Sequence, residues 1–202
     1  MKGVDKMRLV IASNNANKIR EIEQILGSRF DEVVSMRTAG LELDVLEDAD
    51  TFMGNAEKKA VEAARLLPGD AVLADDSGLC VDALGGAPGV YSARYANDGH
   101  DDAANRAKLL ETMKDVPFER RDAHFACAMV LIHPEKGKLT AYGRVNGKIL
   151  NEEIGENGFG YDSLFLYEPD GLSFAQIDAQ RKNAISHRHN ALMLLLSALG
   201  ED

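Results

Sequence analysis

Two adjacent carboxylates, Asp75 and Asp76, follow a short hydrophobic run that ends at Ala74. Neighbouring carboxylates repel each other unless a positive charge lies beside them. A divalent cation would supply that charge, and Mg²⁺ typically takes one or two carboxylates together with phosphate oxygens. Because Asp, Ser and Gly are frequent in turns, Asp75–Gly78 is predicted to be a turn. This turn either holds Mg²⁺ or is solvated, with an aspartate as a helix cap.

A polar run separates an expected buried strand, Leu9–Ala12, from an expected helix with Ile22 and Leu26 on one face. The run consists of Ser13, Asn14, Asn15, Ala16, Asn17 and Lys18. Backbone N–H groups and the helix dipole make such a helix start suitable for an anion. The GxxxxGK[ST] pattern of a P-loop is absent. The run therefore predicts either an anion site or an Asn-rich turn that caps the helix.

A second helix is expected from about Thr51 to Leu67, and its spacing places Lys59 on the apolar face beside Asn55. An unpaired ammonium group is costly to bury, so Lys59 needs an anionic partner. That partner is either a structural carboxylate, which we favour, or a phosphate. The acidic stretch around Glu47 is interpreted as a solvated loop that could also add a metal ligand.

A glycine-rich segment combines two aromatic residues with an acid. It consists of Gly158, Phe159, Gly160, Tyr161 and Asp162. Such a set predicts either a surface on which a planar base stacks or, as is commoner for aromatic residues at a strand entrance, part of the core.

A basic segment follows near the C-terminal end, where Lys182, His187 and Arg188 gather at an expected helix start that Ser186 can cap. Cations are disfavoured at a helix N-terminus. The three donors therefore indicate an anionic or hydrogen-bonding ligand, or else a solvated basic turn.

Alternating strands and helices must position these residues. Strands are expected at 9–12, 72–74, 123–132, 139–145 and 163–167, and helices after 18 and at 51–67, 101–113 and 186–199. The turn at 134–137 joins two strands into a hairpin, so the predicted fold is α/β with a mixed sheet. In the third helix, Ala103, Ala107 and Leu110 are expected to face inward.

Composition limits the possible partners and locations. The 202 residues indicate one globular domain, and 23 basic against 33 acidic residues give a charge of -10, which opposes binding to nucleic acid or acidic membranes. The two cysteines form no zinc or disulfide pattern. The apolar runs are too short for a signal peptide or a membrane span, so a cytoplasmic location is expected.

Together these segments resemble the inosine triphosphate pyrophosphatase family, which acts on noncanonical purine nucleoside triphosphates. The segments that carry the resemblance, in family order, are Ser13–Lys18, Thr51–Ala60, Ala74–Leu79, Leu84–Gly89, Gly158–Asp162 and Ile185–Arg188. The resemblance implies one bilobed domain over residues 1–202, with a long mixed sheet and helices in two lobes around a central nucleotide-binding cleft. It also implies a homodimer.

The implied reaction is hydrolysis of ITP, dITP or XTP between the α- and β-phosphates, with Mg²⁺ as cofactor, which cleanses the nucleotide pool. Carried over by motif, Asp76 would be the general base and a metal ligand, and Ser77 would contact the substrate. Ser13, Asn14, Asn15, Ala16, Asn17, Lys18 and Lys59 would bind the triphosphate. Phe159, Gly160, Tyr161, Asp162, Lys182, His187 and Arg188 would hold the base.

Four positions depart from the usual family pattern. Gly54 stands where Glu is common, so Glu47, at the family's usual spacing before Lys59, is the better second metal ligand. Ser163 stands where Pro is usual, Arg181 where Glu is usual, and Asn17 where Gly is frequent. Two other functions stay open: a pyrophosphatase for modified pyrimidine nucleotides, and a nucleotide sensor without catalysis.

Overall fold

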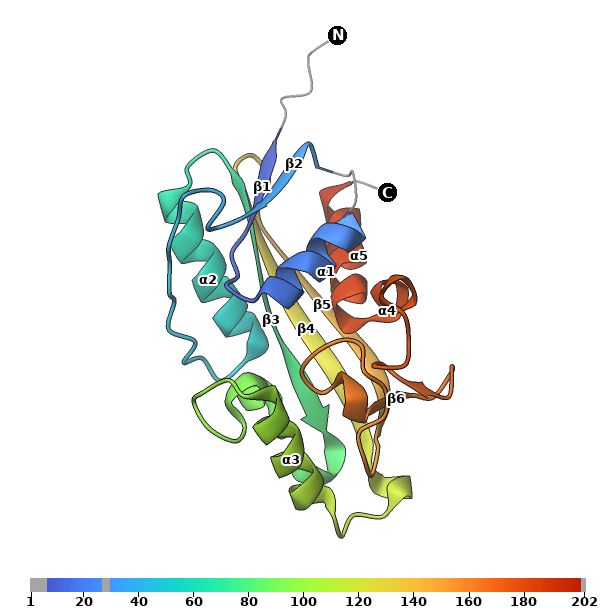
Figure 1. The fold of residues 1–202 in the computed structure, drawn as a ribbon. Helices are drawn as coiled ribbons and strands as arrows, with labels where there is room; N and C mark the ends of the chain where they lie inside the picture. Colours follow the sequence, from blue (N-terminus) through green and yellow to red (C-terminus); the bar gives the residue numbers. More distant parts are fainter. Residues whose placement is uncertain (1–6, 27–29, 201–202) are drawn as a thin grey trace. The chain divides into compact units, whose positions relative to one another are not determined.

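The computed structural model describes residues 7–26 and 30–200 and shows strands that alternate with helices (Figure 1). The strands are β1 (Arg8–Ile11), β2 (Glu32–Ser35), β3 (Ala71–Val81), β4 (Asp122–His133), β5 (Gly137–Ile149), β6 (Phe165–Tyr167) and β7 (Leu172–Ser173). The helices are α1 (Ala16–Leu26), α2 (Phe52–Leu66), α3 (Asp102–Met113), α4 (Ala179–Ile185) and α5 (His187–Leu199).

Within the described residues, the strands form one sheet in the order β2-β1-β3-β4-β5-β6-β7. β1 is parallel to both of its neighbours, and Leu9 pairs with Val33 of β2 and with Ala71 of β3. β6 is antiparallel to β5 and to β7. The sheet is therefore mixed, which confirms the predicted α/β fold.

The chain divides into two compact units. The first consists of Met1–Asp76, Cys127–Gly143 and Arg188–Asp202, and the second of Ser77–Ala126 and Arg144–His187. β3, β4 and β5 each contribute residues to both units, so a single strand can carry side chains that belong to different cores.

The first unit has an aliphatic core. Leu73 of β3 and Met129 of β4 are buried together with Ile22 of α1 and Leu195 of α5. Figure 1 shows α1 and α5 side by side, with α2 on the other side of the sheet. Burial of this kind contributes about 25 cal/mol per Å² of apolar surface removed from water. The two helical layers therefore hold the first part of β3 rigidly between them.

The second unit has an aromatic core. The rings of Phe125, Phe165 and Phe174 lie close together, with centroid separations of 4.6 Å for Phe125 and Phe165 and 4.9 Å for Phe165 and Phe174. Leu109 and Met113 of α3 are buried in the same cluster. Aromatic pairs of this kind contribute about 0.5–1.5 kcal/mol beyond the area that they bury.

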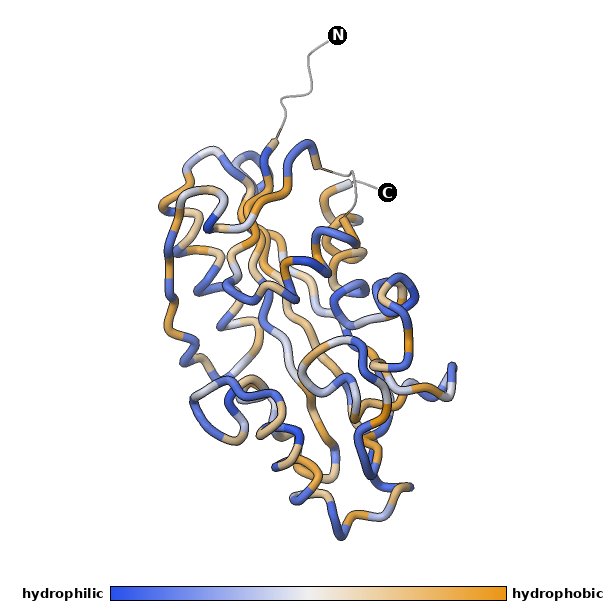
Figure 2. The backbone as a smooth tube through the Cα atoms, in the orientation of Figure 1, coloured by the Kyte–Doolittle hydropathy of each residue, from blue (hydrophilic) through white to orange (hydrophobic). Residues whose placement is uncertain are grey.

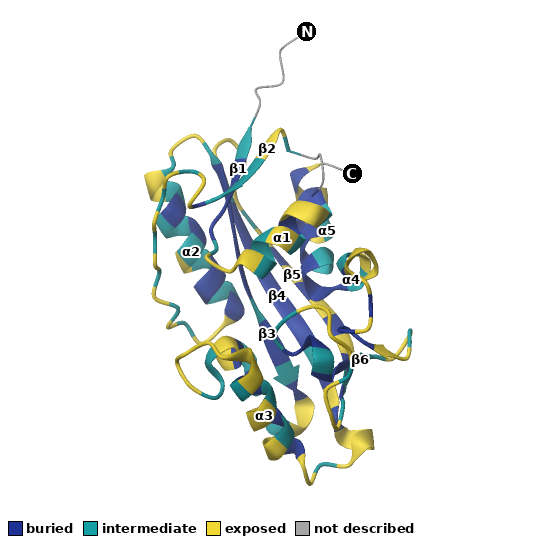
Figure 3. Ribbon diagram, viewed as in Figure 1, coloured by how far each residue is buried: buried dark blue, intermediate teal, exposed yellow. Residues whose placement is uncertain are grey.

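β3 and β4 are the most completely buried strands near the candidate site. Figure 3 shows β4 buried over most of its length, as its apolar sequence predicts. Figure 2 shows β3 changing from hydrophobic to hydrophilic and back along its length, because Asp75, Asp76 and Ser77 interrupt its apolar residues. A polar segment inside a buried strand needs polar partners.

Several local predictions were incomplete. β2, β7 and α4 were not predicted, and α1 begins at Ala16 rather than after Lys18. The predicted inward face of α3 was wrong for Ala103 and Ala107, which are exposed, whereas Leu110 packs against the core as expected. The buried residues of α3 are Asn105, Leu109 and Met113. Small alanine side chains fit either face of a helix, so they are weak markers of the buried one.

No helix in the described part of the chain is long and apolar enough to cross a membrane. The expectation that the first residues are no signal peptide concerns Met1–Met7, of which residues 1–6 lie outside the described part.

Candidate active site

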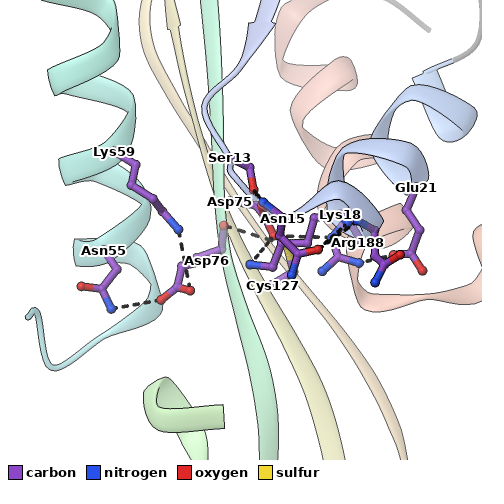
Figure 4. A network of polar contacts seen from close by, with 12 residues as sticks. Ser13, Asn15, Lys18, Glu21, Asn55, Lys59, Asp75, Asp76, Cys127 and Arg188 are labelled. Atoms are coloured by element: carbon purple, nitrogen blue, oxygen red, sulfur yellow. Dashed lines mark hydrogen bonds and ion pairs between the residues drawn. The ribbon is translucent and has the colours of Figure 1, made fainter. Parts of the chain in front are cut away.

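The acidic pair Asp75 and Asp76 lies inside β3, so the predicted turn at Asp75–Gly78 was wrong. Aspartate, serine and glycine favour turns locally, but these residues continue β3 past the part that pairs with β1, and β3 neighbours β4 in the sheet. Strand pairing overrides the local preference. Successive side chains of a strand point to opposite faces. The two carboxylates therefore do not share one site, and each has its own partners (Figure 4).

Asp75 lies in a chain of ion pairs whose centre is buried. Its Oδ2 is 3.2 Å from Lys18 Nζ and 3.4 Å from Arg188 Nε, and 4.0 Å from the thiol of Cys127. Arg188 in turn pairs with Glu21 through Nη1. Asp75 and Arg188 are buried, whereas the side chains of Lys18 and Glu21 are 15% and 12% exposed, so two cations and two anions alternate from the interior towards the surface.

The pKa shifts of Asp75, Lys18 and Arg188 all favour the charged form. Burial alone raises the pKa of Asp75, but the charges of Lys18 and Arg188 outweigh it and hold the pKa well below its usual range. Burial lowers the pKa of Arg188, but the charges of Asp75 and Glu21 raise it by more, so the net shift is an increase. Burial raises the pKa of Cys127, so its thiol stays protonated and donates towards the carboxylate.

Asp76 has the opposite electrostatic character. Asn55 Nδ2 donates to its Oδ2 at 3.1 Å, and Lys59 Nζ lies 3.9 Å from its Oδ1. Burial raises the pKa of Asp76, the charges of Lys18 and Lys59 lower it, and Glu47 raises it again, with a net increase. A carboxylate with a raised pKa takes up a proton more readily than an ordinary one, which suits a general base.

α2 delivers the partners of Asp76. Thr51 caps the helix, its Oγ1 accepting the N–H of Gly54 at 3.1 Å. Asn55 and Lys59 are one turn apart and therefore share a face. The predicted inward position of Lys59 is confirmed, and its partners are the carboxylates of Glu47, at 3.2 Å, and Asp76.

The start of α1 is a capped helix N-terminus. Asn15 Oδ1 accepts the N–H groups of Asn17 at 3.0 Å and Lys18 at 3.2 Å, and Ser13 Oγ accepts the N–H of Asn15. Asn14 donates to the carbonyl of Leu43. The capping role that the Asn-rich run predicts is therefore confirmed, whereas phosphate binding by Ser13–Lys18 stays a prediction. The cap fixes the helix turn from which Lys18 reaches Asp75.

The aromatic and acidic segment lies in the second unit, with Lys182. Lys182 Nζ is 2.5 Å from Asp162 Oδ2 and 4.8 Å from the centroid of the Phe159 ring. The Lys182 side chain is 5% exposed, so this pair is strongly shielded from solvent. Tyr161 is a core residue, and its hydroxyl donates to the carbonyl of Ser92 at 2.8 Å.

The basic segment does not form one cluster at a helix start. Lys182 lies in the last turn of α4, where the helix dipole favours a cation. Ser186 follows α4, has extended backbone and directly precedes α5, so its capping of α5 stays a prediction. His187 is stacked on Phe125 in the second unit, with the ring centroids 4.9 Å apart. Arg188 belongs to the first unit and is 1% exposed. Its observed partners are Asp75 and Glu21, so a contact with the base stays a prediction.

Three residues that the structure places in the site were not predicted to have a role there: Glu21, Asn55 and Cys127. Glu21 follows Lys18 by one turn of α1, and Asn55 precedes Lys59 by one turn of α2, so helical spacing could have indicated both. Cys127 comes from β4, and no local pattern connects it with β3.

The donor set around Asp76 suits a hard divalent cation. Glu47 and Asp76 both contact Lys59, and carboxylate oxygens are the ligands that Mg²⁺ prefers. Among residues 7–26 and 30–200, no group of three or more His, Cys, Asp or Glu side chains is placed to hold a metal. Two carboxylates fit Mg²⁺, which usually keeps several waters and takes its other ligands from substrate phosphates.

Comparison with known proteins identifies close similarities over nearly the full chain. The model of the Ham1 family matches residues 9–198. A dITP/XTP pyrophosphatase of Leuconostoc mesenteroides is 48% identical over 94% of this chain and 94% of its own length. A dITP/XTP pyrophosphatase of Clostridium tetani is 47% identical over 91% of this chain and 92% of its own length.

Solved structures give the same result. The Staphylococcus aureus Ham1 protein has a TM-score of 0.85 at 40% identity and covers 96% of this chain and 100% of its own. A nucleoside-triphosphatase / dITP/XTP pyrophosphatase of Mycobacterium abscessus has a TM-score of 0.74 at 41% identity. It covers 94% of this chain and 99% of its own. The resemblance stated from sequence motifs is therefore confirmed.

Proposed function

Because this chain belongs to the Ham1 family, we propose that it hydrolyses noncanonical purine nucleoside triphosphates such as ITP, dITP and XTP. The products are the nucleoside monophosphate and pyrophosphate, so the enzyme is a hydrolase that cleanses the nucleotide pool. The names of its relatives, dITP/XTP pyrophosphatases at 48% and 47% identity, support this substrate class. The observation that carries the proposal is the family match over residues 9–198, together with the placement of Asp76 beside Asn55 and Lys59.

Asp76 acts as the general base. Its raised pKa and its position beside Lys59 allow it to take a proton from the attacking water as that water approaches phosphorus. The hydrogen bond from Asn55 fixes the carboxylate plane, which limits the directions from which the proton is accepted. Such positioned proton transfer contributes roughly 10²–10⁴-fold to a rate.

Lys18 and Lys59 neutralise the charge of the triphosphate. Phosphoryl transfer depends mainly on positioning and on stabilisation of negative charge that spreads over the phosphate oxygens. Asp75 lies 3.2 Å from Lys18. Burial lowers the pKa of Lys18 and the charge of Asp75 raises it, with a net increase, which supports a charged Lys18. The chain of Asp75, Arg188 and Glu21 therefore fixes one catalytic cation before substrate arrives. Ser13–Asn17 bind the triphosphate next to this cation.

Mg²⁺ is the proposed cofactor, held by Glu47 and Asp76. When bound, it would supply further positive charge to the phosphate oxygens and to the pyrophosphate leaving group. The carboxylate pair on Lys59 supports this assignment, since the ammonium group keeps both side chains together without a metal.

The proposed base-recognising residues belong to the second unit, with the exception of Arg188, which belongs to the first. Phe159 offers a ring face, Lys182 and His187 offer donors to an oxygen at purine position 6, and Gly160, Tyr161 and Asp162 shape the loop. Ser77 follows Asp76 on β3 and contacts the nucleotide, and Arg188 completes the proposed donor set. An adenine amino group would face donor against donor, which costs about 1–3 kcal/mol per contact and rejects ATP by roughly tenfold to hundredfold.

Other features of the proposal concern the whole chain. Residues 1–202 act as one pyrophosphatase domain, as a family match over residues 9–198 supports. The net charge of -10 supports the absence of nucleic acid among its partners. We also propose a homodimer in the cytoplasm, by resemblance to the family.

A nucleotide panel tests the substrate class. ITP, dITP, XTP, ATP, GTP and modified UTP and CTP are incubated with the protein and Mg²⁺, and monophosphate formation is measured by chromatography. We expect turnover of the 6-oxo purine nucleotides ITP, dITP and XTP and poor turnover of ATP. Preference for a modified pyrimidine nucleotide, or tight ITP binding without turnover, would contradict the proposal.

A further inference from the structure

The loop that carries Phe159 has little conformational restraint of its own. Gly158 and Gly160 on either side both have positive φ, at 77° and 60°. A Cβ at Gly158 would lie 2.1 Å from Asp162 Oδ2, so only glycine fits there. Glycine has the widest choice of backbone conformations, and fixing it costs more entropy than fixing any other residue. The observed loop conformation therefore needs support from other parts of the chain.

α3 supplies that support at Gly160. The Asp102 carboxylate accepts the N–H of Gly160 at 2.9 Å, and Arg106 Nη1 donates to the carbonyl of Gly160 at 3.0 Å. Asp102 and Arg106 are one turn apart and lie on the same face of the helix. Both backbone polar groups of a single glycine are thus held by one helix.

Arg106 is itself fixed from the other end of the loop. Its Nε donates to Glu153 Oε2 at 2.7 Å, and the same oxygen accepts the hydroxyl of Ser163 at 2.9 Å. Ser163 directly follows Asp162. The contacts therefore run from Gly160 through Arg106 and Glu153 back to Ser163, and they close around the loop.

Movement of Gly160 would disturb the residues that face the base. The N–H of the preceding residue, Phe159, donates to Asp162 Oδ2 at 2.9 Å, and the same oxygen binds Lys182. The position of the Phe159 ring and that of the Lys182 ammonium group thus depend on one carboxylate oxygen inside the clamped loop.

We propose that Asp102 and Arg106 are positioning residues that clamp Gly160 and thereby set the selectivity for the purine base. The inference rests on the proposed function, which assigns Phe159 and Lys182 to the base. The Arg106 side chain is 20% exposed and that of Glu153 is 43% exposed. Ion pairs in such surroundings contribute little to overall stability, so removing them loosens the loop without unfolding the protein.

Two measurements on the same variants test the proposal. Arg106→Ala and Asp102→Ala remove the clamp, whereas Asp102→Asn keeps an oxygen that can accept the Gly160 N–H. Arg65→Ala is the matched control, because Arg65 also pairs with a glutamate, Glu62, on a helix surface. Amide hydrogen exchange of residues 158–162 is measured in the nucleotide-free protein, and KM and kcat are measured with ITP and ATP.

The alanine variants should exchange these amides about tenfold faster and show a KM for ITP about tenfold higher, with unchanged kcat. The preference for ITP over ATP should fall by a similar factor, and Asp102→Asn and Arg65→Ala should behave like the wild type. Unchanged exchange in the alanine variants would overturn the clamp. Faster exchange with unchanged KM and selectivity would overturn its role in positioning. If the wild-type protein turns over no nucleotide, the proposed function fails, and the exchange comparison still decides whether the clamp exists.

Discussion

Asp75 and Asp76 are neighbours in the sequence, but β3 gives them opposite surroundings. Asp75 faces Lys18 and Arg188 and stays ionised, whereas Asp76 faces Asn55 and Lys59 and has a raised pKa. Two carboxylates whose environments drive their pKa values apart take different roles in catalysis. The proposed function accordingly uses Asp75 as a fixed charge beside Lys18 and Asp76 as the proton acceptor.

Substitution of each aspartate by asparagine should separate these roles. Asp76→Asn removes the base but keeps an oxygen for the Asn55 hydrogen bond, so turnover should fall by roughly 10²–10⁴-fold while the protein stays folded. Asp75→Asn leaves Lys18 and Arg188 facing a neutral group, so the free energy of unfolding should fall by about 3–5 kcal/mol. Kinetics and urea unfolding of both variants check this, and equal effects in the two would contradict the assignment.

Glu47 should control the metal requirement. Glu47→Gln keeps a hydrogen-bonding side chain near Lys59 but replaces the negatively charged carboxylate by a neutral amide. The Mg²⁺ concentration for half-maximal activity should therefore rise about tenfold. Asp48→Asn is the matched control, because Asp48 pairs with the exposed Lys58 and should leave that concentration unchanged. A chelator should abolish turnover without altering the circular dichroism spectrum. Full activity of the chelated protein would exclude the proposed cofactor.

At the scale of elements, the sequence predicts helices better than the polar part of a strand. The spacing of α2 places Lys59 correctly, because a helix of that length has a clear apolar stripe. The interior of β3 could not be predicted, because Asp75–Gly78 resembles a turn and only pairing with strands far away in the sequence makes it extended. The short α4 and the partition of His187 and Arg188 between two units also depend on tertiary packing.

The start of α2 connects a helix cap with the catalytic carboxylate. A Cβ at Gly54 would lie 2.8 Å from the Cβ of Ala49, and Ala49 donates its N–H to Asn55 Oδ1 at 2.9 Å. The other end of the Asn55 amide holds Asp76. Gly54 is therefore matched to its neighbour Ala49.

Gly54→Ala should push Ala49 away and disturb Asn55, and through it Asp76. We expect kcat for ITP to fall about tenfold, as is typical when a positioned catalytic group is misplaced. The double variant Gly54→Ala with Ala49→Gly removes the clash and should recover most of the lost activity. Steady-state kinetics of the three proteins check this, and a double variant no better than Gly54→Ala would contradict the link.

At the scale of the whole molecule, an acidic chain acts on a still more acidic substrate. The charge of -10 is spread over the chain, but Lys18, Lys59 and Lys182 each have a carboxylate partner and little exposure. These lysines are held in place before substrate binds, so little reorganisation is needed. The net charge alone argues against binding to nucleic acid or acidic membranes. The suitability for an anionic nucleotide depends on where the individual lysines lie.

The most direct test of the central claim is the identity of the phosphorus products formed from ITP with Mg²⁺, followed by ³¹P nuclear magnetic resonance. Water attack directed by Asp76 between the α- and β-phosphates predicts equal amounts of pyrophosphate and IMP, with no IDP at any time. Release of orthophosphate together with IDP would contradict the account.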